Sequence, residues 1–185
     1  MTSSFTERLF ISTKENHMLV DKHPFTALIK NSKDAGNVYI NFNKICIFVL
    51  QNTFDELIDD EDPFYEIYKK LYRPDVDQVE FFISSNLSFL LERCEEFPIE
   101  HAYLFYLGLL MGGNILSKSL PQHQAFLSFG SILESKKLIQ DFKQYLNDTI
   151  KTKAEQDTFI SRVNVSYRII KLVFDDYYKK ITSYI

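Results

Sequence analysis

The placement of the prolines constrains the fold of this chain more than any other feature. Proline lacks a backbone N–H and breaks or kinks a helix when it stands inside one. All five prolines fall between stretches in which apolar residues recur at helical spacing: Pro24, Pro63, Pro74, Pro98 and Pro121. The sequence has no internal repeat and no strong two-residue alternation, which a half-buried strand would need. It therefore predicts an all-α fold whose helices begin or end near the prolines.

The helical patterns cover most of the chain. Ser3 or Ser4 can cap a first helix in which Phe5, Leu9 and Thr13 recur at helical spacing, followed by His17 and Val20. We expect further helices over 38–58, 64–72, 76–97, 98–120, 132–150 and 155–180, and a partly buried irregular segment over 121–130. With 185 residues, the chain suits one domain, which we place at 1–185.

Composition excludes several classes of partner. The net charge is −4 and no block of lysine or arginine stands out, so neither a nucleic-acid surface nor an anionic-membrane surface is predicted. Cys46 and Cys94 have neither a CxxC spacing nor a disulfide framework. The start of the sequence lacks a signal-peptide pattern, and the stretch 102–117 is too short to span a membrane. We expect a cytoplasmic protein without membrane insertion.

Three of the five glycines lie within six residues of one apolar helix: Gly108, Gly112 and Gly113. Each glycine inside a helix costs roughly 0.5–1 kcal/mol relative to alanine. Gly108 and Gly112 are four residues apart and so share a face. A bare face admits either another helix crossing closely or a flat ligand. Spacing alone favours the helix crossing.

The surrounding residues "HAYLFYLGLLMGGNILSK" resemble the distal helix of heme oxygenases, HAYxxYLGDLSGGQ. The matching residues are His101, Ala102, Tyr103, Tyr106, Leu107, Gly108, Leu110, Gly112 and Gly113. This resemblance implies that the glycines let the helix kink over a heme face and that their carbonyls help to hold ordered water.

The first helix carries a second resemblance. "STKENHMLVDKHPF" is similar to the family's proximal pattern TKExHxxxE, with Asp21 where the family has glutamate. The resemblance implies that His17 ligates iron, that Asp21 accepts the imidazole Nδ1–H so that Nε2 faces the metal, and that Lys14 lies near a heme propionate. A histidine on an apolar stripe is more often a core residue, so that reading stays open.

Two softer resemblances lie toward the C-terminus. "DFKQYLND" is similar to the family's FKQLYRSR segment, which implies that Lys143 pairs with a propionate; a solvated surface lysine is the alternative. The last helix matches loosely and implies that Tyr167 and Phe174 form part of an aromatic wall beside the heme.

The chain also departs from the family's pattern. Leu109 stands where the family has the aspartate that anchors its distal water network, and Phe105 and Asn147 replace arginines. Gln51 aligns loosely with a distal tyrosine. Leucine can neither hold a water nor relay a proton.

The resemblance implies a single-domain, heme oxygenase-like helical bundle with heme b, both substrate and cofactor, between the first helix and the glycine helix. The implied reaction uses O₂ and an electron donor such as a ferredoxin or flavin reductase, and yields biliverdin, CO and ferrous iron. His17, Gly108 and Gly112 would be catalytic, and Tyr103 and Gly113 would contact the heme. Two alternatives are a heme protein without turnover, serving sensing, storage or transfer, and a helical interaction protein without heme.

Overall fold

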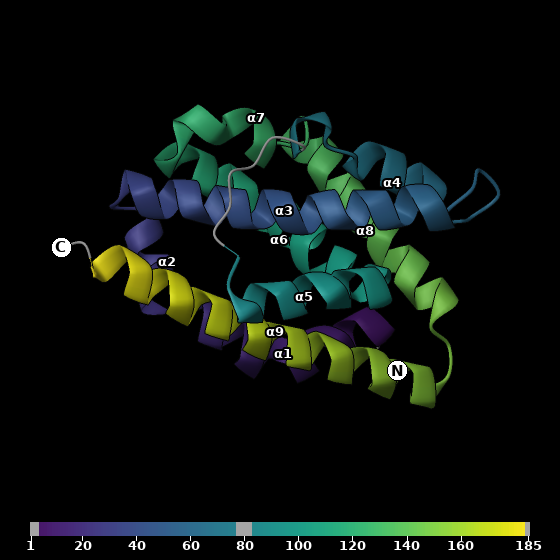
Figure 1. The fold of residues 1–185 in the computed structure, drawn as a ribbon. Helices are drawn as coiled ribbons and strands as arrows, with labels where there is room; N and C mark the ends of the chain where they lie inside the picture. The colour runs from purple at the N-terminus through teal and green to yellow at the C-terminus, as the bar shows by residue number, and fades with distance from the viewer. Residues whose placement is uncertain (1–3, 77–82, 184–185) are drawn as a thin grey trace.

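The computed structural model describes residues 4–76 and 83–183, and this part of the chain contains helices and no strand, as predicted (Figure 1). The α-helices are α1 (Phe5–Asp21), α2 (Pro24–Ile29), α3 (Lys33–Leu57), α4 (Tyr65–Leu71), α5 (Ser85–Glu96), α6 (Pro98–Ser119), α7 (Gln124–Leu127), α8 (Ile132–Thr149) and α9 (Lys153–Thr182). Two 3₁₀ turns, η1 (Pro74–Val76) and η2 (Pro121–His123), complete the series. No helix of the described residues is both long and apolar enough to span a membrane.

Local sequence explains where these helices begin. Pro24 and Pro98 stand in the first turn of α2 and α6, where the missing N–H is harmless. Ser4, not Ser3, caps α1, and its hydroxyl accepts from the Glu7 N–H while Glu7 reaches back to the Ser4 N–H. The same reciprocal capping starts α8 and α9.

Two expected elements differ from the structure. The helix expected over 76–97 begins at Ser85, where the Ser84 hydroxyl caps it, and residues 77–82 of that expectation lie outside the described residues. The segment 121–130, expected to be irregular, instead forms η2 and α7. Pro121 starts this turn, and Phe126 and Leu127 are buried, so packing stabilises helices too short to form alone.

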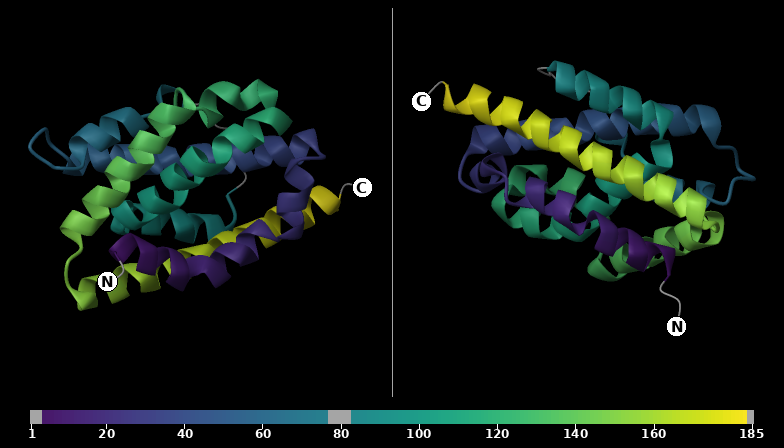
Figure 2. Two further views of the ribbon diagram at one scale, coloured as in Figure 1. Left: turned by 180° about the vertical axis from the view of Figure 1, so that it is seen from behind. Right: turned by 90° about the horizontal axis from the view of Figure 1, so that it is seen from below.

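Two helices far apart in sequence run side by side: α1 lies along α9 (Figure 2). Helix α6 is more central, because it packs against α3, α5, α7, α8 and α9. Aromatic side chains fill much of the interior, and Phe42 of α3 makes edge contacts with Phe105 of α6 and Phe174 of α9.

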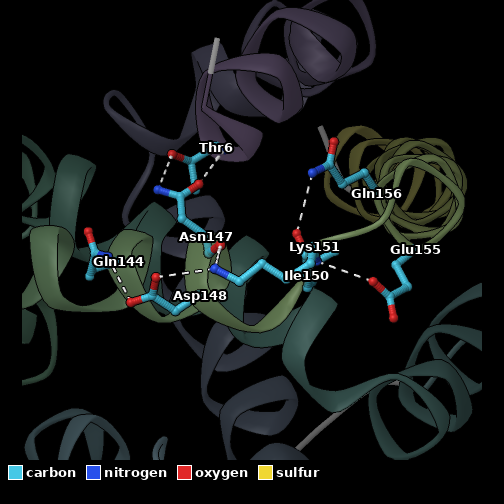
Figure 3. A network of polar contacts seen from close by, with 8 residues as sticks. All are labelled: Thr6, Gln144, Asn147, Asp148, Ile150, Lys151, Glu155 and Gln156. Carbon is cyan, nitrogen blue, oxygen red and sulfur yellow. Dashed lines mark hydrogen bonds and ion pairs between the residues drawn. The ribbon is translucent and has the colours of Figure 1, made fainter. Parts of the chain in front are cut away.

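Side chains of α8 and α9 hold the N-terminal half of α1 (Figure 3). The Asn147 Oδ1 accepts from the Thr6 N–H at 3.0 Å, and its Nδ2 donates to the Thr6 Oγ1 at 3.3 Å. Arg8 donates to Gln156 and pairs with Asp157 on α9. Asn147, which replaces a family arginine, therefore satisfies a first-turn N–H that α1 cannot satisfy itself.

Candidate functional site

The glycines of α6 divide into two kinds. A Cβ atom at Gly113 would overlap with the carbonyl oxygen of Leu127, so the bare backbone there permits close contact with α7. A Cβ at Gly108 or Gly112 would meet nothing within 4 Å. Helix crossing, which spacing alone favoured, therefore explains Gly113, whereas Gly108 and Gly112 border open space.

Apolar side chains extend this open face of α6. Met111 is 58% exposed and Ile115 is 63% exposed, one helical turn apart and next to the two glycines. Helix α6 thus shows its core-facing side to α3 and α9 and leaves a second apolar strip uncovered. We call this strip, formed by Gly108, Met111, Gly112 and Ile115, the open face of α6.

The stripe of α1 that carries His17 also emerges from the core. Leu9 and Thr13 are buried, whereas the side chain of His17 is 50% exposed. His17 Nδ1 lies 3.0 Å from Asp21 Oδ2, the contact expected from their spacing. A carboxylate can only accept, so Nδ1 carries the proton, and Nε2 of the neutral ring keeps its lone pair for another partner.

Tyrosines connect this part of α1 to α6 and α9. The Tyr103 side chain hydrogen-bonds Thr13, one turn before His17, and burial raises the pKa of Tyr103 more than this bond lowers it. The Tyr167 ring meets the His17 ring edge-on, with centroids 5.4 Å apart. Burial also raises the pKa of Tyr167, with smaller contributions from Tyr103 and Asp21. His17, Asp21, Tyr103 and Tyr167 therefore form one group at the junction of three helices.

The other residues expected at the site lie apart from this group. Phe174 is buried in the core, where its ring centroid lies 4.9 Å from that of Phe25. Lys14 and Lys143 are exposed on α1 and α8. The structure therefore gives Phe174 and Gly113 packing contacts and leaves both lysines at the surface.

The positions that are polar in heme oxygenases are buried or occupied in this chain. Leu109 is only 2% exposed, and Phe105 packs against Phe42. The Gln51 amide is used at both ends, donating to the Arg73 carbonyl and accepting from the Arg73 N–H. None of these three side chains is placed to organise water at the open face.

Sequence reasoning did not identify the role of His101. This buried ring donates from Nδ1 to the Phe97 carbonyl at 2.8 Å, so its Nε2 accepts from the Ser166 hydroxyl at 2.9 Å. Burial lowers the pKa of His101 to about 4, so the ring is neutral near pH 7. His101 joins α6 to α9, and the necessary signal, Ser166, lies 65 residues away.

The donor set limits which metal group would suit the site. Residues 4–76 and 83–183 contain no group of three or more His, Cys, Asp or Glu side chains placed to hold an ion. A single available imidazole suits a metal whose other ligands come from its own macrocycle.

Solved structures share this fold. No family model matches the chain, and no curated protein sequence matches it. Heme oxygenase-1 of the cyanobacterium Synechocystis sp. PCC6803, solved in complex with heme, is 18% identical at a TM-score of 0.72, over 94% of this chain and 92% of that one. Heme oxygenase-2 of Synechocystis sp. PCC 6803, solved with heme and NO, is 15% identical at 0.78, over 99% and 88%. The heme oxygenase of Leptospira interrogans is 16% identical at 0.75, over 94% and 100%. The chain therefore has the fold seen in heme oxygenases, as the sequence predicted.

Proposed function

We propose that this protein binds heme b and is a heme oxygenase. One observation carries the proposal: the half-exposed His17, oriented by Asp21, and the open face of α6 are both left uncovered by the protein. Heme is a flat, largely apolar group that brings four nitrogen ligands and lacks an axial one. Such a group matches one oriented imidazole and an apolar strip without side chains at Gly108 and Gly112.

Each residue of the site has a defined task in this proposal. Asp21 holds the Nδ1 proton of His17 and directs the Nε2 lone pair toward the metal. Gly108 and Gly112 let the backbone of α6 approach the group closely. Tyr103 and Tyr167 hold the neighbouring helices, and the exposed Lys14 and Lys143 offer positive charge to the carboxylates of the ligand.

When bound, heme would supply the redox chemistry, with O₂ and electrons from a donor such as a ferredoxin or flavin reductase. The chain's own residues would orient the ring, exclude water and control protons. The products would be biliverdin, CO and ferrous iron. The resemblance of the helix motifs and the fold of the three solved heme oxygenases support this assignment.

A second function is favoured by Leu109. This side chain is buried and apolar where the resembled family has a carboxylate, so the chain lacks that anchor for water. The second candidate is thus a heme-binding protein that senses, stores or transfers heme without cleaving it. A helical interaction protein without heme is the third, and predicts no binding of hemin at all.

Titration of the purified protein with hemin separates the three. A saturable Soret band at one hemin per chain supports heme binding, and its absence supports the interaction protein. Addition of a reductant under air, with catalase present, then distinguishes turnover from storage: heme oxygenase activity bleaches the Soret band and forms biliverdin. A stable ferrous-oxy spectrum without biliverdin supports the non-catalytic protein. A cytoplasmic location and a single domain over 1–185 belong to the same proposal.

A further inference from the structure

A buried hydroxyl on α6 is left unpaired. Tyr106 is fully buried, and its hydroxyl has no hydrogen-bond partner within residues 4–76 and 83–183. Buried polar groups in folded proteins are almost always paired with protein or with an ordered water. Leaving one unpaired destabilises the folded state, so the Tyr106 hydroxyl points to a partner that is not a side chain of this bundle.

A polar group of residues surrounds the position. The Tyr68 hydroxyl lies 2.6 Å from Asp55 Oδ1 and 3.2 Å from the Gln51 carbonyl oxygen. The carboxylate is the stronger acceptor and takes the phenolic proton, which leaves lone pairs on the Tyr68 oxygen. Burial is the main cause that raises the pKa of Tyr106, and Tyr68 is its nearest charged influence. Asp55 is exposed, so this group begins at the solvent.

Tyr106 also has a defined relation to Leu109. Residues three apart share a helical face, so the Tyr106 ring lies one turn before Leu109 on the same side of α6. Tyr106 therefore supplies a polar atom on the face where Leu109 removed the family's carboxylate.

We propose that the Tyr106 hydroxyl binds an internal water molecule, and that this water joins it to Tyr68 and Asp55 as a hydrogen-bonded route from solvent to α6. A buried water typically makes two to four hydrogen bonds, and the two tyrosine oxygens provide two of them. Along such a route each hydroxyl gives up one proton and receives another. One proton moves inward for each proton that enters at Asp55, and no oxidant or reductant is consumed.

Thermal unfolding of the ligand-free protein tests the water site. Tyr106→Phe removes only the hydroxyl and keeps the ring that packs the core. If the hydroxyl holds a water, we expect the Tm to fall by about 2–4 °C, the shift that loss of one satisfied hydrogen bond gives in a chain of this size. A Tm that is unchanged or higher would show that the hydroxyl is unpaired and would overturn the site.

A double-mutant cycle tests the route. Tyr106→Phe and Tyr68→Phe should be coupled, because the water loses its place once either hydroxyl is gone, so the double variant should lower the Tm by less than the sum of the single variants. Tyr65→Phe, on the same helix α4 as Tyr68, is the matched control and should add to Tyr106→Phe. Additive shifts for Tyr68 and Tyr106 would refute the connection.

The catalytic use of this route rests on the proposed function and is tested separately. In the hemin-loaded protein, Asp55→Asn should leave hemin affinity unchanged and reduce biliverdin per heme several-fold, whereas Glu56→Gln, one residue along α3, should match wild type. Equal yields from both variants would exclude this use. If wild type forms no biliverdin, the proposed function fails, while the unfolding measurements still decide the water site and its connection to Tyr68.

Discussion

His17 and Asp21 are joined across one turn of α1, with Nδ1 of the imidazole 3.0 Å from the carboxylate oxygen Oδ2. Both side chains are about half exposed, so the pair adds little to the stability of the helix. Its effect is instead on the ring, which is held as the tautomer that carries its lone pair on Nε2.

Replacing His17 should therefore alter ligand binding and leave folding intact. We expect His17→Ala to lose the six-coordinate ferric heme spectrum and to regain it when imidazole is added, while its Tm stays close to that of wild type. Absorption spectra with and without imidazole measure this. His123→Ala, whose ring pairs with Asn37, is the control; an unchanged spectrum in His17→Ala would exclude His17 as the ligand.

The adjacent glycines Gly112 and Gly113 should respond in opposite ways to added side chains. Gly112→Leu points into open space and should weaken hemin binding with little loss of stability. Gly113→Ala meets the Leu127 carbonyl and should lower the free energy of unfolding by about 1–3 kcal/mol. Hemin titration and chemical unfolding of both variants measure the difference. Equal loss of stability in the two variants would contradict an open face at Gly112.

Restoring a carboxylate at position 109 should not restore a water network by itself. Leu109→Asp loses a buried leucine and places an acid among apolar side chains, so we expect a loss of roughly 3 kcal/mol or more in unfolding free energy. Burial would also raise the pKa of the new acid and keep it neutral. Urea unfolding at two pH values checks this. A variant as stable as wild type, with a higher biliverdin yield, would show that this position is wet.

His101 predicts a defined pH dependence of stability. Because its pKa falls from 6.5 to about 4 on folding, the unfolded chain binds more protons between these values. Its contribution is complete above pH 6.5 and is lost as the pH falls toward 4, in total about 3 kcal/mol. The difference in stability between wild type and His101→Asn, measured from pH 7 to pH 4, isolates this effect from the carboxylates. A constant difference would argue against the low pKa.

The clasp between Asn147 and Thr6 should contribute to stability at one end of α1. Asn147→Ala leaves the Thr6 N–H without its acceptor, and we expect a loss of about 1 kcal/mol. Gln144→Ala, on the exposed side of α8, is the control and removes only a contact with Asp148. Hydrogen exchange at Thr6 should increase in Asn147→Ala alone.

Much of the fold could be predicted because it depends on local sequence. Proline positions, capping serines and apolar spacing each act within a few residues, and they place the helix starts at Pro24, Pro98 and Ser131. The expectation for 121–130 was wrong because the burial of Phe126 and Leu127, which stabilises those short helices, is a tertiary effect.

The site could be predicted in part for the same reason. The contact between His17 and Asp21 follows from their four-residue spacing. Gly112 and Gly113 look alike in sequence, and only the position of Leu127 separates them. Tyr167 and Phe174 lie two turns apart on one stripe of α9, yet only Tyr167 reaches His17, because Phe25 and Phe42 enclose Phe174.

The contacts of α1 also set an order of events during synthesis. This helix leaves the ribosome first, but it docks on residues made last: Thr6 binds Asn147 and Asn16 binds Asn164. Helix α1 is thus unsupported until α8 and α9 have emerged, and its N-terminal partners lie more than 140 residues away. The imidazole of His17 therefore reaches its final place only when the chain is almost complete, so a nascent or truncated chain would not capture a prosthetic group prematurely.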